Sequence, residues 1–389
     1  MRAVRGALMN SEERREARRR RREEERARKK AARTEQCTLE EIADLNNLYR
    51  AARQAARGVS WKSSVQRYGI HALRNCVRAR DDVLNGRSVC KGFVHFDIWE
   101  RGKLRHISSV HFSERVVQKS LTQNALVPAI VPTLVTGNSA NIKGRGTDYA
   151  VRRLKSQLVR HYRLHGSEGY VLLIDFSDFF ARMRHDHVKG IVASAIGDER
   201  VVALASSLID SQGDVGLGLG SEPNQICAVA YPSVIDHYVE EMLGVEAYGR
   251  YMDDTYCLHE SKEYLQVVKM LIEQKCDELG IVINAKKTQI VKLSRGFKFL
   301  KKRFSYGPNG RIAVRPCRES ITRERRKLKK LAKMYDEGSI SYEQVLRSYM
   351  SWRGSMKKLD AHKTVLSMDA LFARLFNPEN RSRGGVSLK

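Results

Sequence analysis

Two adjacent aspartates, Asp253 and Asp254, follow Tyr251 and Met252 in a stretch, 247–259, whose pattern predicts a β-hairpin. Neighbouring side chains on a straight strand point to opposite faces, so both carboxylates reach one place only if they lie at the turn. Carboxylates held together raise each other's pKa unless a cation neutralises them. Hard oxygen ligands of this kind suit Mg²⁺.

A third carboxylate, Asp175, ends the apolar run 171–174. A strand this apolar is normally buried on both faces, and a carboxylate at its end is costly without a partner. Two metal ions about 3.5–4 Å apart clamp the attacking and leaving oxygens of a phosphoryl transfer. We therefore predict that Asp175, Asp253 and Asp254 are catalytic and bind two Mg²⁺ ions, with Mn²⁺ as the alternative metal. The competing interpretation is two unrelated acidic surface turns.

The elements that must position these carboxylates alternate between helical and strand patterns. Helices are predicted at 38–57, 148–163, 186–196, 224–243 and 262–279, and strands at 93–99, 104–107, 170–174, 282–283 and near 289–304. Thr38 to Glu41 and Ser341 to Gln344 each have the sequence of a capping box, which begins a helix. From about residue 315 the chain becomes basic and helical.

Charge is the dominant feature of the composition. The 389 residues carry a formal net charge of +27, and 42% of them are hydrophobic, which is enough for a sizeable core. A protein this basic favours a polyanionic partner, with nucleic acid a stronger candidate than an anionic membrane surface. Residues 1–36 are densely charged, and Glu and Arg recur among them at i,i+4 spacing, which allows either a solvated helix or a disordered arm.

Targeting and cysteine patterns are unremarkable. No apolar stretch approaches the roughly 20 residues of a membrane span, and the N-terminus lacks the apolar segment of a signal peptide, so we expect a cytoplasmic protein without a membrane partner. The seven cysteines include no CxxC pair, so neither a zinc site nor a disulfide framework is indicated. His185 and His187 flank Asp186 and have metal-ligand types, but Asp186 is better explained as a helix cap.

Taken in order, residues 93–304 resemble the fingers and palm of reverse transcriptases. Asp175–Phe180 is similar to the first catalytic motif of that family, and Tyr251–Asp254 is similar to its aspartate-pair signature. Gly280–Thr288 is similar to the motif that follows the aspartate pair, and Phe297–Leu300 is similar to the primer-grip hairpin. Lys301 stands where a glycine is usual. Ser351–Gly354 lies where bacterial members, of the group II intron and retron-like superfamily, have a comparable thumb sequence. The resemblance covers about three quarters of the chain.

The resemblance implies an α+β fold, the right-hand polymerase, with fingers, a palm of antiparallel sheet plus helices, and an all-helical thumb after a basic helical N-terminal extension. The expected boundaries are a charged arm at 1–36, the helical extension at 37–90, fingers at 91–170, palm at 171–310, and thumb with tail at 311–389.

The resemblance also assigns binding roles. Nucleotide-binding residues are expected at Lys103, Arg105, Phe176, Phe180, Gly220, Gln225 and Lys287. In the family, the residue that corresponds to Arg105 binds the triphosphate of the incoming nucleotide. The residue that corresponds to Phe180 excludes a ribose 2′-hydroxyl, and the one that corresponds to Lys287 lies near the leaving pyrophosphate. Nucleic-acid contacts are expected at Arg145, Tyr251, Met252, Phe299, Leu300, Arg326, Lys330 and Trp352.

One loop departs from the common family pattern. Most members have Pro-Gln-Gly, whereas this chain has Gly218-Leu219-Gly220 followed by Gln225. An apolar residue before the glycine resembles diversity-generating and unclassified, defence-associated bacterial members. Leu219 cannot hydrogen-bond as a glutamine would, so altered fidelity or template handling is a hypothesis.

These features predict an RNA-directed DNA polymerase that adds deoxynucleotides to a primer. The expected partners are an RNA template, in particular a structured noncoding RNA of bacterial antiphage defence, the DNA product and deoxynucleoside triphosphates. A diversity-generating retroelement polymerase is one alternative. An RNA-binding maturase or chaperone that uses the fold as a scaffold is another. A homo-oligomer and an accessory protein both stay open.

Overall fold

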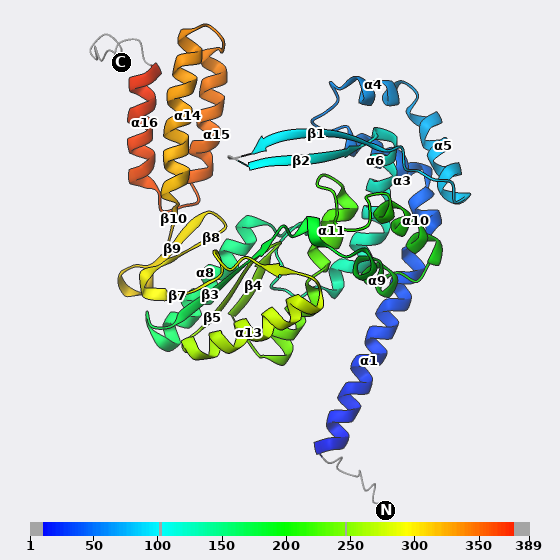
Figure 1. Ribbon diagram of the computed structural model, residues 1–389, viewed down its shortest axis with the longest axis horizontal. Coiled ribbons are helices and arrows are strands. Elements are labelled where there is room, and N and C mark those ends of the chain that lie inside the picture. Colours follow the sequence, from blue (N-terminus) through cyan, green and yellow to red (C-terminus); the bar gives the residue numbers. More distant parts are fainter. Residues whose placement is uncertain (1–10, 101–102, 246, 377–389) are drawn as a thin grey trace, which may run out of the picture. The chain divides into compact units, whose positions relative to one another are not determined.

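The computed structural model describes residues 11–100, 103–245 and 247–376 (Figure 1). Its chain combines helices with antiparallel sheets, which agrees with the predicted α+β class. It divides into two compact units, each made of three segments. Unit 1 comprises 1–146, 176–242 and 272–283, and unit 2 comprises 147–175, 243–271 and 284–389. Within the described ranges, no helix is long and apolar enough to cross a membrane.

Unit 1 is mostly helical. Its helices are α1 (Ser11–Gln36), α2 (Leu39–Ala43), α3 (Leu45–Ala55), α4 (Ser63–Ile70), α5 (Ala72–Leu84), α6 (Phe112–Leu121), α7 (Val127–Ile130), α9 (His185–Ala195), α10 (Glu199–Asp210), α11 (Glu222–Ala230) and α12 (Ser233–His237). The predicted hairpin is confirmed as β1 (Phe93–Glu100) paired with β2 (Lys103–Val110). Its turn residues, 101 and 102, lie outside the described residues.

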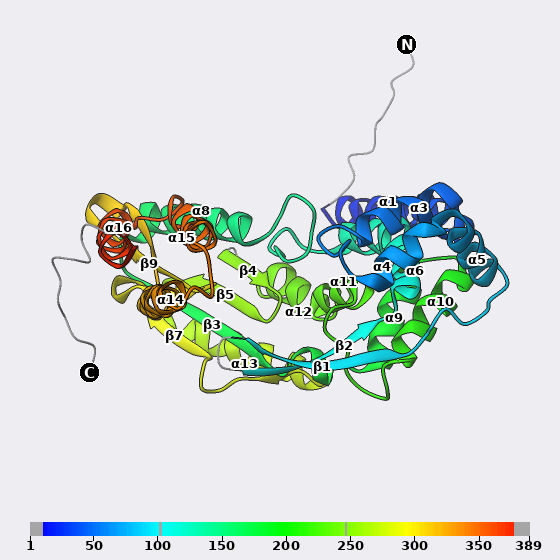
Figure 2. The same cartoon turned by 90° about the horizontal axis from the view of Figure 1, so that it is seen from above.

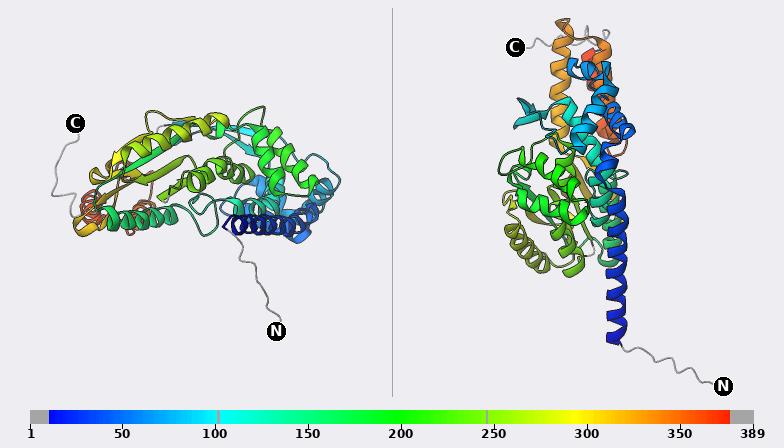
Figure 3. Two further views of the ribbon diagram at one scale, coloured as in Figure 1. Left: turned by 90° about the horizontal axis from the view of Figure 1, so that it is seen from below. Right: turned by 90° about the vertical axis from the view of Figure 1, so that its right-hand side faces the viewer.

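Residues 11–36 of the charged arm form a helix, α1, seen along its length in Figure 3. Pairs at i,i+4 spacing line it, including Arg19 with Glu23 at 3.0 Å and Arg20 with Glu16 at 2.9 Å. Exposed pairs of this kind contribute only about 0.3–0.5 kcal/mol each, so they support the helix weakly. The structure therefore favours the helical alternative over a disordered arm.

Two predicted helices are interrupted. The helix predicted at 38–57 begins as expected, because the Thr38 hydroxyl accepts a hydrogen bond from the Glu41 amide, but it breaks at Asp44. The Asp44 carboxylate accepts a hydrogen bond from the Asn47 amide at 2.9 Å and so caps α3. Aspartate is one of the preferred residues at a helix N-cap. The prediction of one continuous helix at 224–243 was also wrong. Pro232 lies between α11 and α12, and it has no amide hydrogen with which to continue the helix.

Unit 2 is built on an antiparallel sheet. The strands are β3 (Tyr170–Ser177), β4 (Ala247–Tyr251), β5 (Asp254–His259) and β7 (Gln289–Lys292), and β3 pairs with both β5 and β7. Residues 171–174 of β3 are at most 7% exposed, which confirms a strand buried on both faces. Helix α8 (Thr147–His165) packs Leu154 and Leu158 against this sheet. The end of β3, already in unit 1, pairs with β6 (Val282–Ile283), and α13 (Lys262–Glu278) crosses the boundary between the units.

A second sheet and a helical bundle complete unit 2. The sheet consists of β8 (Phe297–Phe299), β9 (Lys302–Tyr306) and β10 (Ile312–Pro316). The bundle consists of α14 (Arg318–Asp336), α15 (Tyr342–Met356) and α16 (His362–Phe376), which Figure 2 shows end-on. Leu328, Val345 and Met368, one from each helix, are fully buried in its core. The predicted capping box at Ser341 and Gln344 is confirmed.

Candidate active site

The register of β3 and β5 brings two of the predicted catalytic residues together. Asp175 lies directly opposite Asp254 in the antiparallel pair. Opposed residues of such a pair point to the same face, with their Cβ atoms about 4.5–5.5 Å apart. Asp175 is 9% exposed and follows four buried apolar residues, so the strand delivers its carboxylate to this place with little freedom.

The third aspartate lies in the adjoining turn. Tyr251 pairs with Asp254, which leaves Met252 and Asp253 as a two-residue connection between β4 and β5. Met252 has a φ of +57°, a region that side chains other than glycine seldom adopt. The guanidinium of Arg250, 1% exposed, donates to the Met252 carbonyl oxygen at 3.0 Å. A buried cation thus holds an unusual backbone, and such strain is concentrated at functional sites.

The segment after β6 holds Asp175 from the other side. The amide of Asn284 donates to the Asp175 carbonyl oxygen at 2.8 Å, and the Asn284 side chain donates to Asp175 Oδ1 at 3.1 Å. Lys287 Nζ lies 2.8 Å from both carboxylate oxygens of Asp175. The Thr288 hydroxyl accepts from the Asp175 amide at 3.4 Å. Three residues of one turn therefore position Asp175, two through its carboxylate and one through its backbone amide.

Negative charge is concentrated here. Burial, followed by repulsion from Asp253 and Asp175, raises the pKa of Asp254 to about 7, and Lys287 partly opposes the shift. The hydrogen bond to Asp175 raises the pKa of Lys287. In the described residues, no group of three or more His, Cys, Asp or Glu is arranged to hold a metal ion. The Lys287 ammonium neutralises the Asp175 carboxylate through both of its oxygens.

The loop before α11 lies in unit 1 and is internally braced. The Gln212 side chain accepts from the Gly218 amide at 2.6 Å, and Asn224 donates to the Gly218 carbonyl at 2.8 Å. Gly220 has a φ of +106°, and a Cβ there would meet nothing within 4 Å, so its backbone conformation rather than lack of space calls for glycine. Gln225, on α11, is half-buried. The Gln212–Asn224 brace was not predicted, although both side chains are amides that flank a glycine-rich loop.

Three aromatic residues follow Asp175, and they differ in burial. Phe176 and Phe179 are 4% and 7% exposed, with ring centroids 5.4 Å apart, and Phe179 also packs edge-on against Tyr231. Phe180 is only half-buried, at the start of a 3₁₀ turn. Phe179 is thus a core residue, whereas the Phe180 ring keeps an exposed surface.

The structure describes the three residues predicted to bind from the fingers to different extents. Lys103 and Arg105 lie on β2 by their backbone, opposite Glu100 and Ile98, but their side chains are outside the described part of the structure. Arg145 Nη1 donates to the carbonyl oxygens of Asn138 at 2.8 Å and Val135 at 3.4 Å. At least part of the Arg145 guanidinium therefore holds the loop that precedes it.

The predicted primer-grip residues belong to the sheet core of unit 2. Phe299 is 5% exposed and packs edge-on against Tyr256, with ring centroids 5.0 Å apart, and Tyr251 packs against the same cluster. Leu300 and Lys301 form the two-residue turn to β9 with φ values of +47° and +60°. Positive φ at both positions explains why a glycine is usual where Lys301 stands.

The bundle carries a basic groove of about 640 Å³ between α14 and α16. Its lining includes Arg325, Arg326, Lys329 and Arg374. Of the two predicted cationic contacts on α14, Arg326 lines the groove, while Lys330 is exposed on the helix but does not line it. Arg374 was not among the predicted contacts, because the groove depends on α16 lying beside α14.

Trp352 is half-buried and packs against the core of the bundle. Its ring stacks on Tyr349 with centroids 5.7 Å apart, and its buried Nε1 has no hydrogen-bond partner. Arg353, the next residue, pairs with Asp369 of α16 at 2.9 Å. The Ser351–Gly354 segment thus joins α15 to α16.

The histidine motif at 185–187 has structural partners. His185 Nε2 and His187 Nε2 hydrogen-bond to the carbonyl oxygens of Gly216 at 2.7 Å and Tyr231 at 3.1 Å. The prediction that Asp186 caps α9 was wrong. Arg184 occupies the cap, and Asp186 lies in the first turn, where it pairs with the Arg184 guanidinium.

No protein-family model matches this chain, and no curated protein sequence matches it significantly. Its function is therefore inferred from its own residues.

Proposed function

We propose that this protein is an RNA-directed DNA polymerase that extends a primer by two-metal phosphoryl transfer. The observation that supports the proposal most strongly is the opposition of Asp175 and Asp254 across β3 and β5, with Asp253 in the adjoining turn. These residues come from two motifs far apart in sequence. Burial, followed by repulsion from the other two carboxylates, raises the pKa of Asp254, so the charged cluster is costly without a cation.

The donor set fits a divalent cation in kind, since Asp175, Asp253 and Asp254 supply only hard carboxylate oxygens. When bound, two Mg²⁺ ions would stabilise the attacking and leaving oxygens of the reaction. The chain itself orients the donors: β3 and Asn284 fix Asp175, and Arg250 fixes the turn that carries Asp253. Lys287 then has to leave the Asp175 oxygens, which frees its ammonium to meet the phosphates of an incoming nucleotide.

In the proposed reaction, the primer 3′-hydroxyl attacks the α-phosphate of a deoxynucleoside triphosphate, and pyrophosphate leaves. Positioning and charge neutralisation supply nearly all of the catalysis in such transfers. We propose that the half-buried Phe180 ring excludes a ribose 2′-hydroxyl. Its partial exposure, against the burial of Phe179, supports this assignment.

The basic groove of α14 and α16 is proposed to contact the phosphate backbone of the duplex. Arg325, Arg326 and Arg374 supply guanidinium groups, which bind phosphate oxygens in pairs. An RNA–DNA duplex is recognised through its backbone rather than its base edges, because the major groove of an A-form helix is too narrow to read.

The template is proposed to be a structured noncoding RNA, in keeping with the net charge of +27 and the exposed, basic helix α1. Sequencing the nucleic acid that copurifies with the full chain tests this point. One enriched RNA species supports it, and random cellular RNA contradicts it.

The activity itself is tested by incubating the purified chain with a ribonucleotide template, an annealed deoxynucleotide primer, Mg²⁺ and deoxynucleoside triphosphates. We expect the primer to lengthen. A chain that binds the same duplex but never extends it, with Mg²⁺ or Mn²⁺, would instead support the scaffold alternative.

A further inference from the structure

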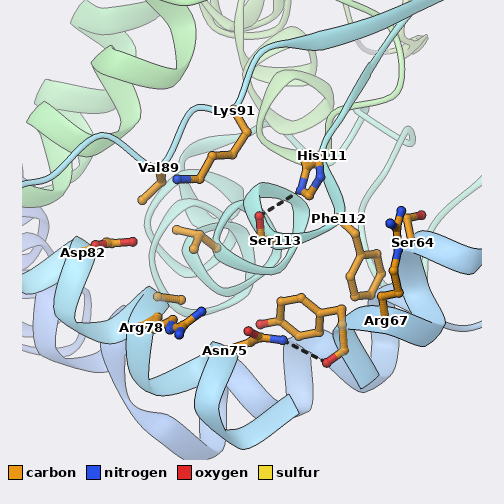
Figure 4. Close-up of a pocket in the computed structure, with 13 residues that line it drawn as sticks. Ser64, Arg67, Asn75, Arg78, Asp82, Val89, Lys91, His111, Phe112 and Ser113 are labelled. Carbon is orange, nitrogen blue, oxygen red and sulfur yellow. Dashed lines mark hydrogen bonds between the residues drawn. The ribbon is translucent and has the colours of Figure 1, made fainter. Parts of the chain in front are cut away.

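Unit 1 contains a cavity of about 460 Å³ formed by residues between 64 and 117 (Figure 4). Helices α4 and α5 form two of its walls, and the segment before β1 and the start of α6 form the others. None of its lining residues belongs to the polymerase-like motifs. A volume of this size is typical of sites for small ligands.

The lining is strongly cationic. Arg67 comes from α4, Arg78 from α5 and Lys91 from the segment before β1. Within the described residues, the charged groups of these three side chains form no ion pair. The lining carboxylate, Asp82, is already neutralised by Arg87, whose Nε lies 2.8 Å from Asp82 Oδ1. The cavity therefore carries an excess of positive charge.

The start of α6 adds to this field. His111 is its N-cap residue, and the His111 side chain makes no capping hydrogen bond to a backbone amide of the first turn. Instead, His111 Nδ1 lies 3.1 Å from the Ser113 hydroxyl, as the dashed line in Figure 4 shows. The first backbone amides of a helix and the helix dipole attract anions. At the start of α6 this attraction adds to that of the three cationic side chains.

Buried contacts hold the walls in place. Glu114 of α6 is 2% exposed, and its Oε2 accepts from the Lys91 amide at 3.0 Å, so it anchors the segment that carries the lysine. The Asn75 side chain donates to the Tyr68 carbonyl oxygen at 3.0 Å, which ties α5 to α4. The Tyr68 ring packs edge-on against Phe112, with centroids 5.0 Å apart. The cationic groups thus stand on a packed frame.

We propose that this cavity is a binding site for a phosphate ester with room for about one nucleotide. A phosphate monoester carries more charge than a carboxylate and offers three acceptor oxygens, and a phosphodiester carries one charge and offers two; either suits guanidinium forks, an ammonium and a helix N-terminus. The ester comes either from a free nucleotide or from one position of an RNA strand. The site needs no metal ion and does not depend on the proposed polymerase activity.

The experiment measures binding by the full-length chain in EDTA, which removes any metal-dependent binding at the aspartates. The probes are a fluorescent adenosine monophosphate and a fluorescent ten-nucleotide single-stranded RNA, with inorganic phosphate as competitor. Arg78→Gln and Lys91→Gln remove cations of the cavity. Arg74→Gln and Arg80→Gln are matched controls, because both arginines are exposed on the same helix, α5, and neither lines the cavity.

We expect each cavity variant to weaken binding of at least one probe by about tenfold or more, as for loss of a charged hydrogen bond. The controls should stay within about twofold, the scale of a surface charge. Binding of the monophosphate, displaced by inorganic phosphate, supports the site with a free nucleotide as its source. Binding of the RNA alone, with a salt dependence that is weaker in the cavity variants, supports it with a strand as the source. Equal losses in cavity variants and controls, or no loss in either, would overturn the proposal.

Discussion

Lys287 Nζ lies 2.8 Å from both carboxylate oxygens of Asp175, although the two residues are 112 positions apart in the chain. The ammonium neutralises a carboxylate that lies beside Asp254, whose pKa is raised by burial and by repulsion from Asp253 and Asp175. The Lys287 side chain is 58% exposed, so it can withdraw into solvent at little cost. Metal binding and this ion pair should therefore compete.

Lys287→Ala should tighten the binding of a divalent metal in the absence of nucleotide. The ion pair is largely exposed, so the gain is at most about fivefold, or ~1 kcal/mol. Electron paramagnetic resonance of bound Mn²⁺ measures the affinity directly. Lys286→Ala is the matched control, since Lys286 is the exposed neighbour and makes no contact with Asp175. Unchanged or weaker Mn²⁺ binding in Lys287→Ala would show that the lysine does not compete.

Phe180→Ala should relax the choice of sugar. Loss of the half-exposed ring opens space for a 2′-hydroxyl, so incorporation of ribonucleotides relative to deoxynucleotides should rise by about tenfold or more, a ~1.4 kcal/mol change in discrimination. Steady-state kinetics with paired ribo- and deoxynucleotides gives this ratio. Phe179→Leu is the control, because Phe179 is buried against Phe176 and Tyr231 and should affect stability but not the ratio. An unchanged ratio in Phe180→Ala removes that residue from the nucleotide site.

Glu324→Gln should stabilise the protein at neutral and alkaline pH. Glu324 is 7% exposed, one carboxylate oxygen lacks a hydrogen bond, and burial raises its pKa. The pKa of this carboxyl is therefore higher in the folded protein than in the unfolded protein. The free energy of unfolding is then highest below the unfolded-state pKa and falls as the pH rises through the folded-state pKa. The glutamine cannot ionise and avoids this loss.

The melting temperature of Glu324→Gln should therefore exceed that of the unmodified chain at pH 8 by a few degrees, and the gap should close near pH 4. Lys327, 3.6 Å from the carboxylate, limits the size of the gain. Glu337→Gln, at an exposed position of the same segment, is the control and should show no such pH dependence. A gap that is constant with pH would rule out the titration of Glu324 as its cause.

Removing two groove cations should weaken duplex binding in a salt-dependent way. The double variant Arg325→Gln with Arg326→Gln loses two proposed phosphate contacts, so the slope of log affinity against log salt should become shallower by about 1.8. Fluorescence anisotropy of a labelled RNA–DNA duplex over a salt series measures it. Lys357→Gln with Lys363→Gln removes the same charge from exposed bundle positions outside the groove. Equal slopes for the two double variants would mean that the groove makes no special contact.

The local features of the fold were predictable because short patterns determine them. The wholly apolar run before Asp175 predicted a buried strand. The two adjacent carboxylates predicted a turn, which the structure places at Met252 and Asp253, with Asp254 the first residue of β5. The Ser341 capping box was equally local. Whether these residues catalyse nucleotide transfer stays a prediction.

Other features were not predictable because they depend on distant or competing residues. The contact of Lys287 with Asp175 forms only in the tertiary fold. The helix is interrupted at Asp44 because the Asp44 side chain caps a new helix there instead of allowing the first one to continue. The groove needs α14 and α16 side by side, which periodicity along α14 alone cannot show, so Arg374 was missed. The cavity of unit 1 likewise joins four segments whose basic residues are unremarkable one by one.

Primer extension by aspartate variants tests the polymerase proposal most directly. Asp175→Asn, Asp253→Asn and Asp254→Asn keep the size of each side chain while removing a metal-binding charge, and Asp81→Asn at an exposed position of α5 is the control. We expect each of the three variants to lose at least about a thousandfold in extension rate, or ~4 kcal/mol of transition-state stabilisation, while duplex binding and the control stay near normal. Extension at the normal rate by any one of the three would contradict the account.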